Sequence, residues 1–381
     1  MLIRSAFKKK GLRFFRSPSR LTVFNLDLHV AVIQDISTFF SPKQTELTRF
    51  SLSIHNHLQR PFYLWSPDPV SIVNQSTWKE LDNSKIELFK RRYRKLLGNF
   101  EGFVVTYPTS FVDLFIETNK PILAVAATRY EAPYTQMAAK WEELNSTLVA
   151  GVTSGQVTLI ANNAGDADYI KHFTGLSIPI LPSLCDGKEL WSGSSGRRVT
   201  MAKDLNLRTS ISEKTQGLYQ PIESLGRPYK WTDLMTCLEV LVIPQNISTM
   251  TLFELATAGV PVVVPGRELL KEMKGLYFGV LDELSFSEVY GVDADGRFGE
   301  SGSPANWKDG SYLDWWLDRA DFFNRELMPN VRVAETYADL MLSDRDVSAL
   351  RESAAHAIQV RNTQIRDRWQ ALITEWTKSL S

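Results

Sequence analysis

Short apolar runs alternate with longer amphipathic stretches along most of this 381-residue chain. The apolar runs are rich in β-branched residues, which is typical of buried parallel strands, and the stretches between them have helical spacing. Because strand, helix and strand in succession form a parallel crossover, the pattern predicts an α/β fold. The predicted strands lie at 21–26, 62–65, 102–106, 122–126, 157–161, 178–181, 240–243, 260–264 and 331–333. The predicted helices lie at 30–40, 83–97, 111–118, 167–173, 233–238, 249–258, 268–273, 312–323 and from 343 onward.

The clearest pattern runs from Leu238 to Gly266 and predicts a strand, a polar loop, a helix and a second strand. Ser248 is the predicted N-cap of the helix, and Gly259 is its predicted end. Ligands of parallel sheets bind at the carboxyl ends of the strands, where the free N–H groups of such a helix favour an anion. The unit therefore predicts a phosphate or diphosphate site.

A polar Ser/Thr turn, a helix with one Glu and then AGVPVVVP resemble the donor-binding unit of GT-B glycosyltransferases. The resemblance covers about thirty residues. It implies two Rossmann-like domains with parallel sheets that face a central cleft. It also implies that the turn holds a nucleotide diphosphate and that Glu254 binds the ribose, so the donor-binding residues are Gln245, Asn246, Ser248, Thr249 and Glu254. An ordinary βαβ unit with a solvated Glu254 is the alternative interpretation.

A Gly/Ser-rich segment at 186–198, DGKELWSGSSGRR, predicts the boundary between the two domains. We expect its last residues, Arg197 and Arg198, to neutralise the diphosphate, although an exposed linker is the commoner meaning of such a run. The predicted organisation is a basic leader at 1–20, an acceptor domain at 21–185, a donor domain at 186–342 and a C-terminal helix at 343–381. By resemblance, that helix returns to the first domain.

Polar residues follow two of the predicted strands in the first domain. Asp27 and His29 come after the first strand, and they are the candidates for a catalytic base if the reaction inverts configuration. The alternative is that one of them caps the next helix while the other packs against it. Arg129 and Glu131 follow the strand at 122–126 and are candidate acceptor contacts, but a local ion pair explains them equally well.

Composition limits the class of protein. The apolar fraction is 44%, the charged fraction is 23% and the formal net charge is zero, as in a soluble globular protein. Two cysteines form neither a disulfide framework nor a metal-ligand spacing, so we expect a cytoplasmic protein. The resemblance to GT-B enzymes implies that it needs no metal, and we expect no cofactor. The chain has no apolar run long enough to span a membrane. The expected cosubstrate is a nucleotide sugar, with a UDP-sugar first.

Two clusters of basic residues, at 4–20 and 90–95, predict a local positive field on the acceptor domain. Such a field favours an anionic partner, which is a glycan, a membrane surface or nucleic acid, while a solvated helix face is the simpler interpretation. The expected function is metal-independent transfer of a sugar from a nucleotide sugar to an acceptor hydroxyl, on a glycan. The alternatives are glycosylation of modified DNA bases, nucleotide-sugar epimerisation, and non-catalytic nucleotide-sugar binding.

Overall fold

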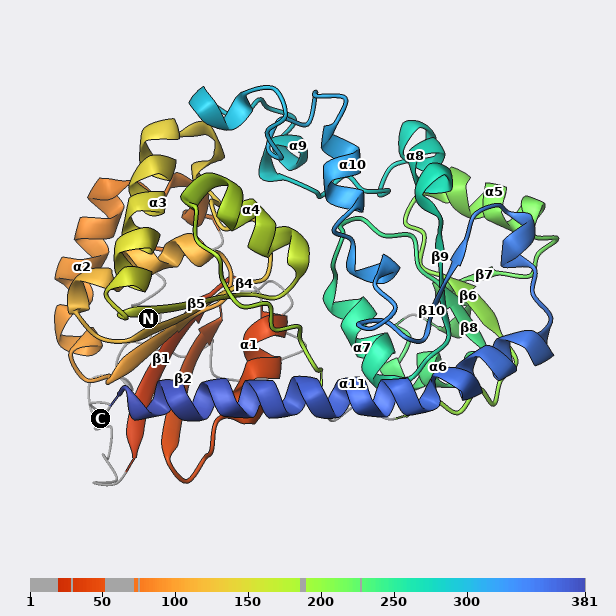
Figure 1. The fold of residues 1–381 in the computed structure, drawn as a ribbon, viewed down its shortest axis with the longest axis horizontal. Helices are drawn as coiled ribbons and strands as arrows, with labels where there is room; N and C mark the ends of the chain where they lie inside the picture. Colours follow the sequence, from red (N-terminus) through yellow and green to blue (C-terminus); the bar gives the residue numbers. More distant parts are fainter. Residues whose placement is uncertain are drawn as a thin grey trace, which may run out of the picture.

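The computed structural model describes residues 20–28, 30–51, 72–74, 76–185, 190–226 and 228–380. Two α/β units lie side by side, each built around a five-stranded sheet (Figure 1). The strand orders are β2-β1-β3-β4-β5 and β10-β9-β8-β6-β7, and neighbouring strands pair in parallel. The predicted α/β class with two parallel sheets is therefore confirmed.

The strands of the first sheet are β1 (Leu21–Asp27), β2 (Thr45–Ser51), β3 (Gly102–Val105), β4 (Ile122–Ala126) and β5 (Val157–Ala161). The first unit also contains α1 (Val30–Ile36), α2 (Asn83–Leu97), α3 (Ala138–Thr153) and α4 (Ala164–Thr174). Helix α2 has the predicted bounds because Asp82 caps its first turn and its apolar positions Ile86, Phe89, Tyr93 and Leu97 are buried.

The strands of the second sheet are β6 (Arg198–Thr200), β7 (Gln220–Pro221), β8 (Glu239–Leu241), β9 (Val262–Pro265) and β10 (Val331–Ala334). Its helices are α5 (Leu205–Lys214), α6 (Trp231–Met235), α7 (Met250–Ala258), α8 (Arg267–Leu276), α9 (Phe286–Tyr290) and α10 (Tyr312–Leu317). The last helix, α11 (Asp344–Lys378), runs beneath both units in Figure 1.

Three predicted elements need correction. The second strand of the chain is β2, which the sequence analysis missed because polar residues interrupt its apolar positions. The predicted strand at 62–65 lies outside the described residues. The helix predicted at 111–118 is a pair of 3-10 turns, Thr109–Leu114 and Ile116–Thr118. The strand predicted at 178–181 is a single bridge between Ala161 and Ile180, because Pro179 and Pro182 cannot donate to a ladder.

Helix α11 packs its C-terminal half on the first unit. The Trp369 ring stacks on the Phe39 ring at 5.7 Å between centroids, and Trp376 meets the edge of Phe40 at 6.1 Å. Both tryptophans belong to a buried apolar cluster with Val23, Val104 and Leu123 of the first sheet. None of the described helices combines the length and the apolar character that crossing a bilayer requires.

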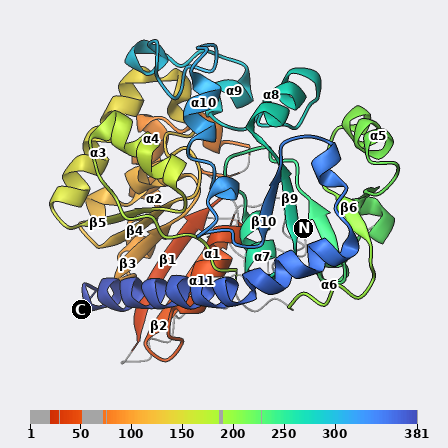
Figure 2. The same ribbon diagram turned by 45° about the vertical axis from the view of Figure 1, so that its right-hand side comes forward.

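The segment between β9 and β10 closes the junction of the two units. Turning the molecule shows α9 and α10 above the gap between the sheets (Figure 2). In this segment Phe298 stacks on Trp141 of α3 at 3.8 Å between centroids. Arg297 pairs with Glu142 of α3, and Arg319 pairs with Asp168 of α4. The two units therefore share an aromatic and ionic interface.

Candidate functional site

The loop between β8 and α7 reaches from the second sheet toward the first unit. Thr249, not the predicted Ser248, is the N-cap of α7, and its side chain accepts a hydrogen bond from the Leu252 N–H. Ser248 instead lies beside the buried Asp321, whose N–H donates to the neighbouring Ile247 carbonyl oxygen at 3.0 Å. Gln245, Asn246 and Glu254, like the two residues above, are half-buried. The structure thus brings all five predicted donor residues onto one loop and the helix that follows it.

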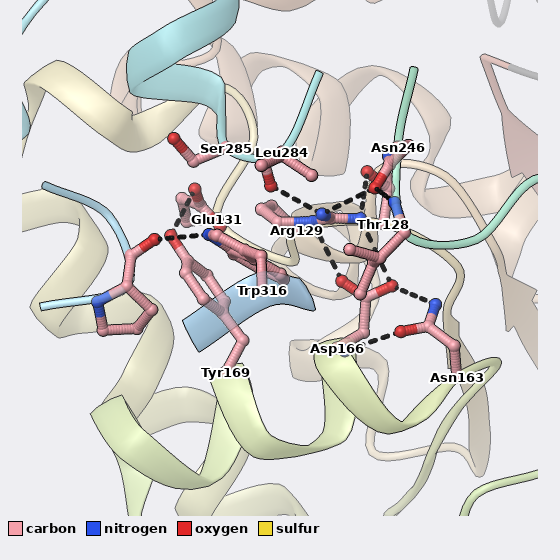
Figure 3. Close-up of polar contacts among 12 residues, drawn as sticks. Thr128, Arg129, Glu131, Asn163, Asp166, Tyr169, Asn246, Leu284, Ser285 and Trp316 are labelled. Atoms are coloured by element: carbon pink, nitrogen blue, oxygen red, sulfur yellow. Dashed lines mark hydrogen bonds and ion pairs between the residues drawn. The ribbon is translucent and has the colours of Figure 1, made fainter. Parts of the chain in front are cut away.

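Arg129, which follows β4, connects the first unit to this loop (Figure 3). Its guanidinium group forms an ion pair with Asp166 at 3.0 Å, and both side chains are only 1% exposed. Its Nη1 donates to Asn246 Oδ1 at 3.1 Å and to the Leu284 carbonyl oxygen at 2.6 Å. The guanidinium group also lies over the Trp316 ring at 4.7 Å. The carboxyl edges of the two sheets therefore meet at Arg129.

Asp166 is held from two directions in this network. The Asn163 side chain donates to Asp166 Oδ2 at 2.6 Å, and Asn163 Oδ1 accepts from the Asp166 N–H as the cap of α4. Close packing continues at Gly165, where a Cβ atom would collide with the Ile247 side chain of the 245–249 loop. Glycine at this position allows α4 to approach the loop closely.

Glu131 is fully buried and is not open to a ligand, which contradicts its predicted role as an acceptor contact. Tyr169 Oη donates to Glu131 Oε1 at 2.9 Å (Figure 3). Burial raises the pKa of Glu131 from its ordinary value of 4.5 to about 8. The side chain is therefore protonated in the folded protein at neutral pH.

We expect stability to fall as pH rises toward 8, because the folded state keeps a proton on Glu131 that the unfolded state loses near its ordinary pKa of 4.5. Glu131→Gln keeps an oxygen for Tyr169 but cannot ionise, so its free energy of unfolding should decline less steeply. Urea unfolding of both proteins between about pH 5 and 8 checks this. Glu326→Gln, at an exposed position, is the control. Equal slopes for all three proteins would mean that Glu131 is ionised in the fold.

Of the two predicted base candidates, the structure describes Asp27. Asp27 is fully buried at the end of β1, where Thr106 Oγ1 donates to its Oδ2 at 3.3 Å. A carboxylate with no exposed surface cannot meet a substrate in this conformation, so Asp27 does not fit the predicted role. His29 lies outside the described residues.

Arg197 and Arg198 lie at the wrong end of the second sheet for the predicted diphosphate contact. Arg198 is the first residue of β6 and lies opposite Glu239, the first residue of the parallel strand β8. Its guanidinium group donates to Asp344 at the start of α11 at 2.7 Å. The 245–249 loop follows the other end of β8. The structure therefore contradicts the placement of this arginine pair beside the loop.

Sequence reasoning missed Lys203, an exposed cation beside the 245–249 loop. Lys203 follows β6, and its exposed side chain donates to Gln245 Oε1. Gly279, with a φ of +80°, packs against both residues: a Cβ atom there would lie 3.4 Å from Gln245 Nε2 and 3.4 Å from Lys203 Cβ. The rule that polar residues gather at the carboxyl ends of parallel strands identifies Lys203 once β6 is placed at 198–200.

A cavity of about 160 Å³ lies where the two units meet. Its lining residues come from the ends of β3, β4 and β8 and from the segment after α8: Tyr107, Thr128, Arg129, Asn246, Glu283, Ser285, Phe286 and Val289.

The basic cluster at 90–95 is partly neutralised, because Lys90 pairs with Glu87 and Glu117. The other basic cluster, at 4–20, lies outside the described residues except for Arg20. No set of three or more Cys, His, Asp or Glu side chains within the described ranges is arranged to hold a metal ion.

No protein-family model and no curated protein matches the chain. Similar solved structures include the glycotransferase of kitacinnamycin, which is 10% identical with a TM-score of 0.43 over 94% of this chain and 99% of that one. MurG from Acinetobacter baumannii is 10% identical with a TM-score of 0.43 over 94% and 100% of the two chains. The calicheamicin glycosyltransferase CalG4 is 11% identical with a TM-score of 0.39 over 94% and 98%.

Proposed function

We propose that this protein is a glycosyltransferase that takes its sugar from a nucleotide sugar, with a UDP-sugar as the first candidate. The observation that supports it best is the meeting of two parallel sheets by their carboxyl edges at the 245–249 loop. Ligands of parallel α/β sheets bind at this edge. The acceptor is a hydroxyl group, on a glycan.

The donor binds the second unit through groups that suit its separate parts. The diphosphate lies at the N-terminus of α7, where the backbone N–H groups and the exposed Lys203 ammonium favour negative charge. Glu254, on the second turn of α7, accepts hydrogen bonds from the ribose hydroxyls. These contacts neutralise the leaving diphosphate without a divalent metal.

The cavity between the units takes only the reacting part of the substrates. Pockets for drug-sized ligands occupy about 300–1,000 Å³, and the cavity of about 160 Å³ is smaller. The nucleoside therefore lies outside it, along the half-buried residues of the loop and α7. The sugar and the acceptor hydroxyl meet in the cavity.

A panel of uridine, guanosine, adenosine and thymidine diphosphate sugars tests the donor site by thermal shift. A ligand at hundredfold excess over its Kd should stabilise the protein by about 2.7 kcal/mol. Glu254→Ala should weaken binding of that ligand by about 1.5–3 kcal/mol in calorimetry, the range for a hydrogen bond to a charged group.

Glu272→Ala, at an exposed position on α8, is the matched control and should bind like the wild-type protein. Absence of a shift with every nucleotide sugar would refute the proposed function. Binding that is indifferent to Glu254→Ala would refute the ribose contact. Binding without turnover would favour the non-catalytic alternative.

A further inference from the structure

The wall of the junction cavity contains one carboxylate that is open to solvent, that of Glu283. This residue lies between α8 and α9, in a stretch that carries no sequence motif. Its neighbours along the cavity wall are hydroxyl and amide groups of Tyr107, Thr128 and Asn246. A carboxylate beside such groups is suited to accept a proton from a bound hydroxyl.

The backbone around Glu283 is held to both units. Leu281 N–H donates to the Pro244 carbonyl oxygen at 2.9 Å, and Glu283 N–H donates to that of Gln245 at 3.0 Å. The next residue, Leu284, accepts from Arg129 of the first unit at 2.6 Å. The backbone that carries this carboxylate is therefore fixed beside the 245–249 loop.

Four other carboxylates, near Arg129 and the 245–249 loop, are buried. Exposed fractions are 0% for Asp27, 0% for Glu131, 1% for Asp166 and 3% for Asp321. Three of them accept a hydrogen bond inside the protein: Asp27 from Thr106, Glu131 from Tyr169 and Asp166 from Asn163. Of the acidic side chains that the structure describes, Glu283 is the one on the cavity wall.

Asn246 complements this carboxylate. Its Oδ1 already accepts from Arg129 Nη1 at 3.1 Å and from the Ile247 N–H at 2.8 Å. The group that Asn246 can offer a ligand is therefore its NH₂, which is a donor only. A hydroxyl oxygen that accepts from Asn246 can donate its proton to Glu283. At about 30 Å³ per molecule, the cavity has room for about five waters, so a hydroxyl fits within it.

We infer that Glu283 is the general base of the transfer reaction, and this inference rests on the proposed function. The acceptor oxygen forms a bond to the anomeric carbon of the donor sugar while the bond from that carbon to the diphosphate oxygen breaks. The bonding electron pair leaves with the diphosphate, and the acceptor proton moves to the Glu283 carboxylate. Water in the cavity reacts in the same way and gives free sugar. A single displacement of this kind inverts the anomeric configuration.

Hydrolysis of the donor found in the nucleotide-sugar panel tests this without a known acceptor. Loss of a general base typically costs about 10²–10⁴-fold, so Glu283→Gln should lower kcat for hydrolysis about 100-fold or more. Its calorimetric Kd for the donor should stay within about twofold of wild type, because the base acts on water.

Glu300→Gln is the control, because Glu300 is exposed in the same segment but lies outside the cavity lining. The free sugar should show inverted configuration by NMR at early times. Wild-type turnover in Glu283→Gln, retained configuration, or donor binding without hydrolysis by the wild-type protein would each overturn the inference. If the wild-type protein binds and hydrolyses the donor while one of the other results is found, the base assignment fails alone. Donor binding without hydrolysis by the wild-type protein counts against the proposed function as well. If no nucleotide sugar binds, the proposed function fails, and the inference fails with it.

Discussion

Replacing Arg129 with methionine should lower the free energy of unfolding by about 3–5 kcal/mol, the usual cost of breaking a buried ion pair by removing one partner. The change leaves the Asp166 carboxylate in a site where both side chains are 1% exposed. It also removes the donor to Asn246 and Leu284, which connects the two units. Urea unfolding followed by tryptophan fluorescence measures the loss.

Arg319→Met is the matched control, since Arg319 also pairs with a carboxylate of α4 and lies over a tryptophan ring, Trp315. That pair is much more exposed, at 27% and 47% of its two side chains, and exposed pairs contribute about 0–1 kcal/mol. A small loss is expected. Similar losses in the two variants would show that burial does not set the energy of the Arg129 pair.

Trp369→Ala should cost about 3–5 kcal/mol, because it empties a large buried site that the surroundings cannot fill. Trp369 is fully buried, stacks on Phe39 with 9° between the ring planes, and donates through Nε1 to the Pro182 carbonyl oxygen at 2.8 Å. The cavity would open between α11 and the first sheet. Thermal and urea unfolding both report the change.

Gln370→Ala, one residue further along the exposed face of α11, is the control and should be within about 0.5 kcal/mol of wild type. If Trp369→Ala were equally mild, the C-terminal half of α11 would not be part of the core of the first unit. The result is independent of any ligand, so it tests the fold separately from the proposed chemistry.

Sequence reasoning worked best where the signal is local. The apolar spacing and the Asp82 cap predict helix α2 with its observed bounds. A continuous apolar run predicts strand β4 with its observed bounds. Strand β6 has three residues, too few for a pattern to show. Because the sequence analysis predicts no strand there, it assigned Arg197 and Arg198 to the ligand and left Lys203 unnoticed.

The candidate site was predicted in part for the same reason. Residues of the 245–249 loop and Glu254 are contiguous with a recognisable strand and helix. Asp321 and Glu283 reach the loop from distant, irregular segments, and no periodicity marks them. Arg129 is buried against Leu284 and Trp316, which lie in the segment between β9 and β10, far from Arg129 in the sequence.

Helix α11 has a mechanical consequence. Its 35 residues span about 50 Å without interruption. Near its middle the buried Arg361 donates to Thr257 of α7 and to the Leu327 carbonyl oxygen, both in the second unit. Toward the C-terminus from Arg361, the helix packs on the first unit through Ile365, Trp369 and Ile373. A change in the angle between the two units would therefore have to bend α11 or break its contacts with one unit. The helix thus resists rotation of one unit relative to the other.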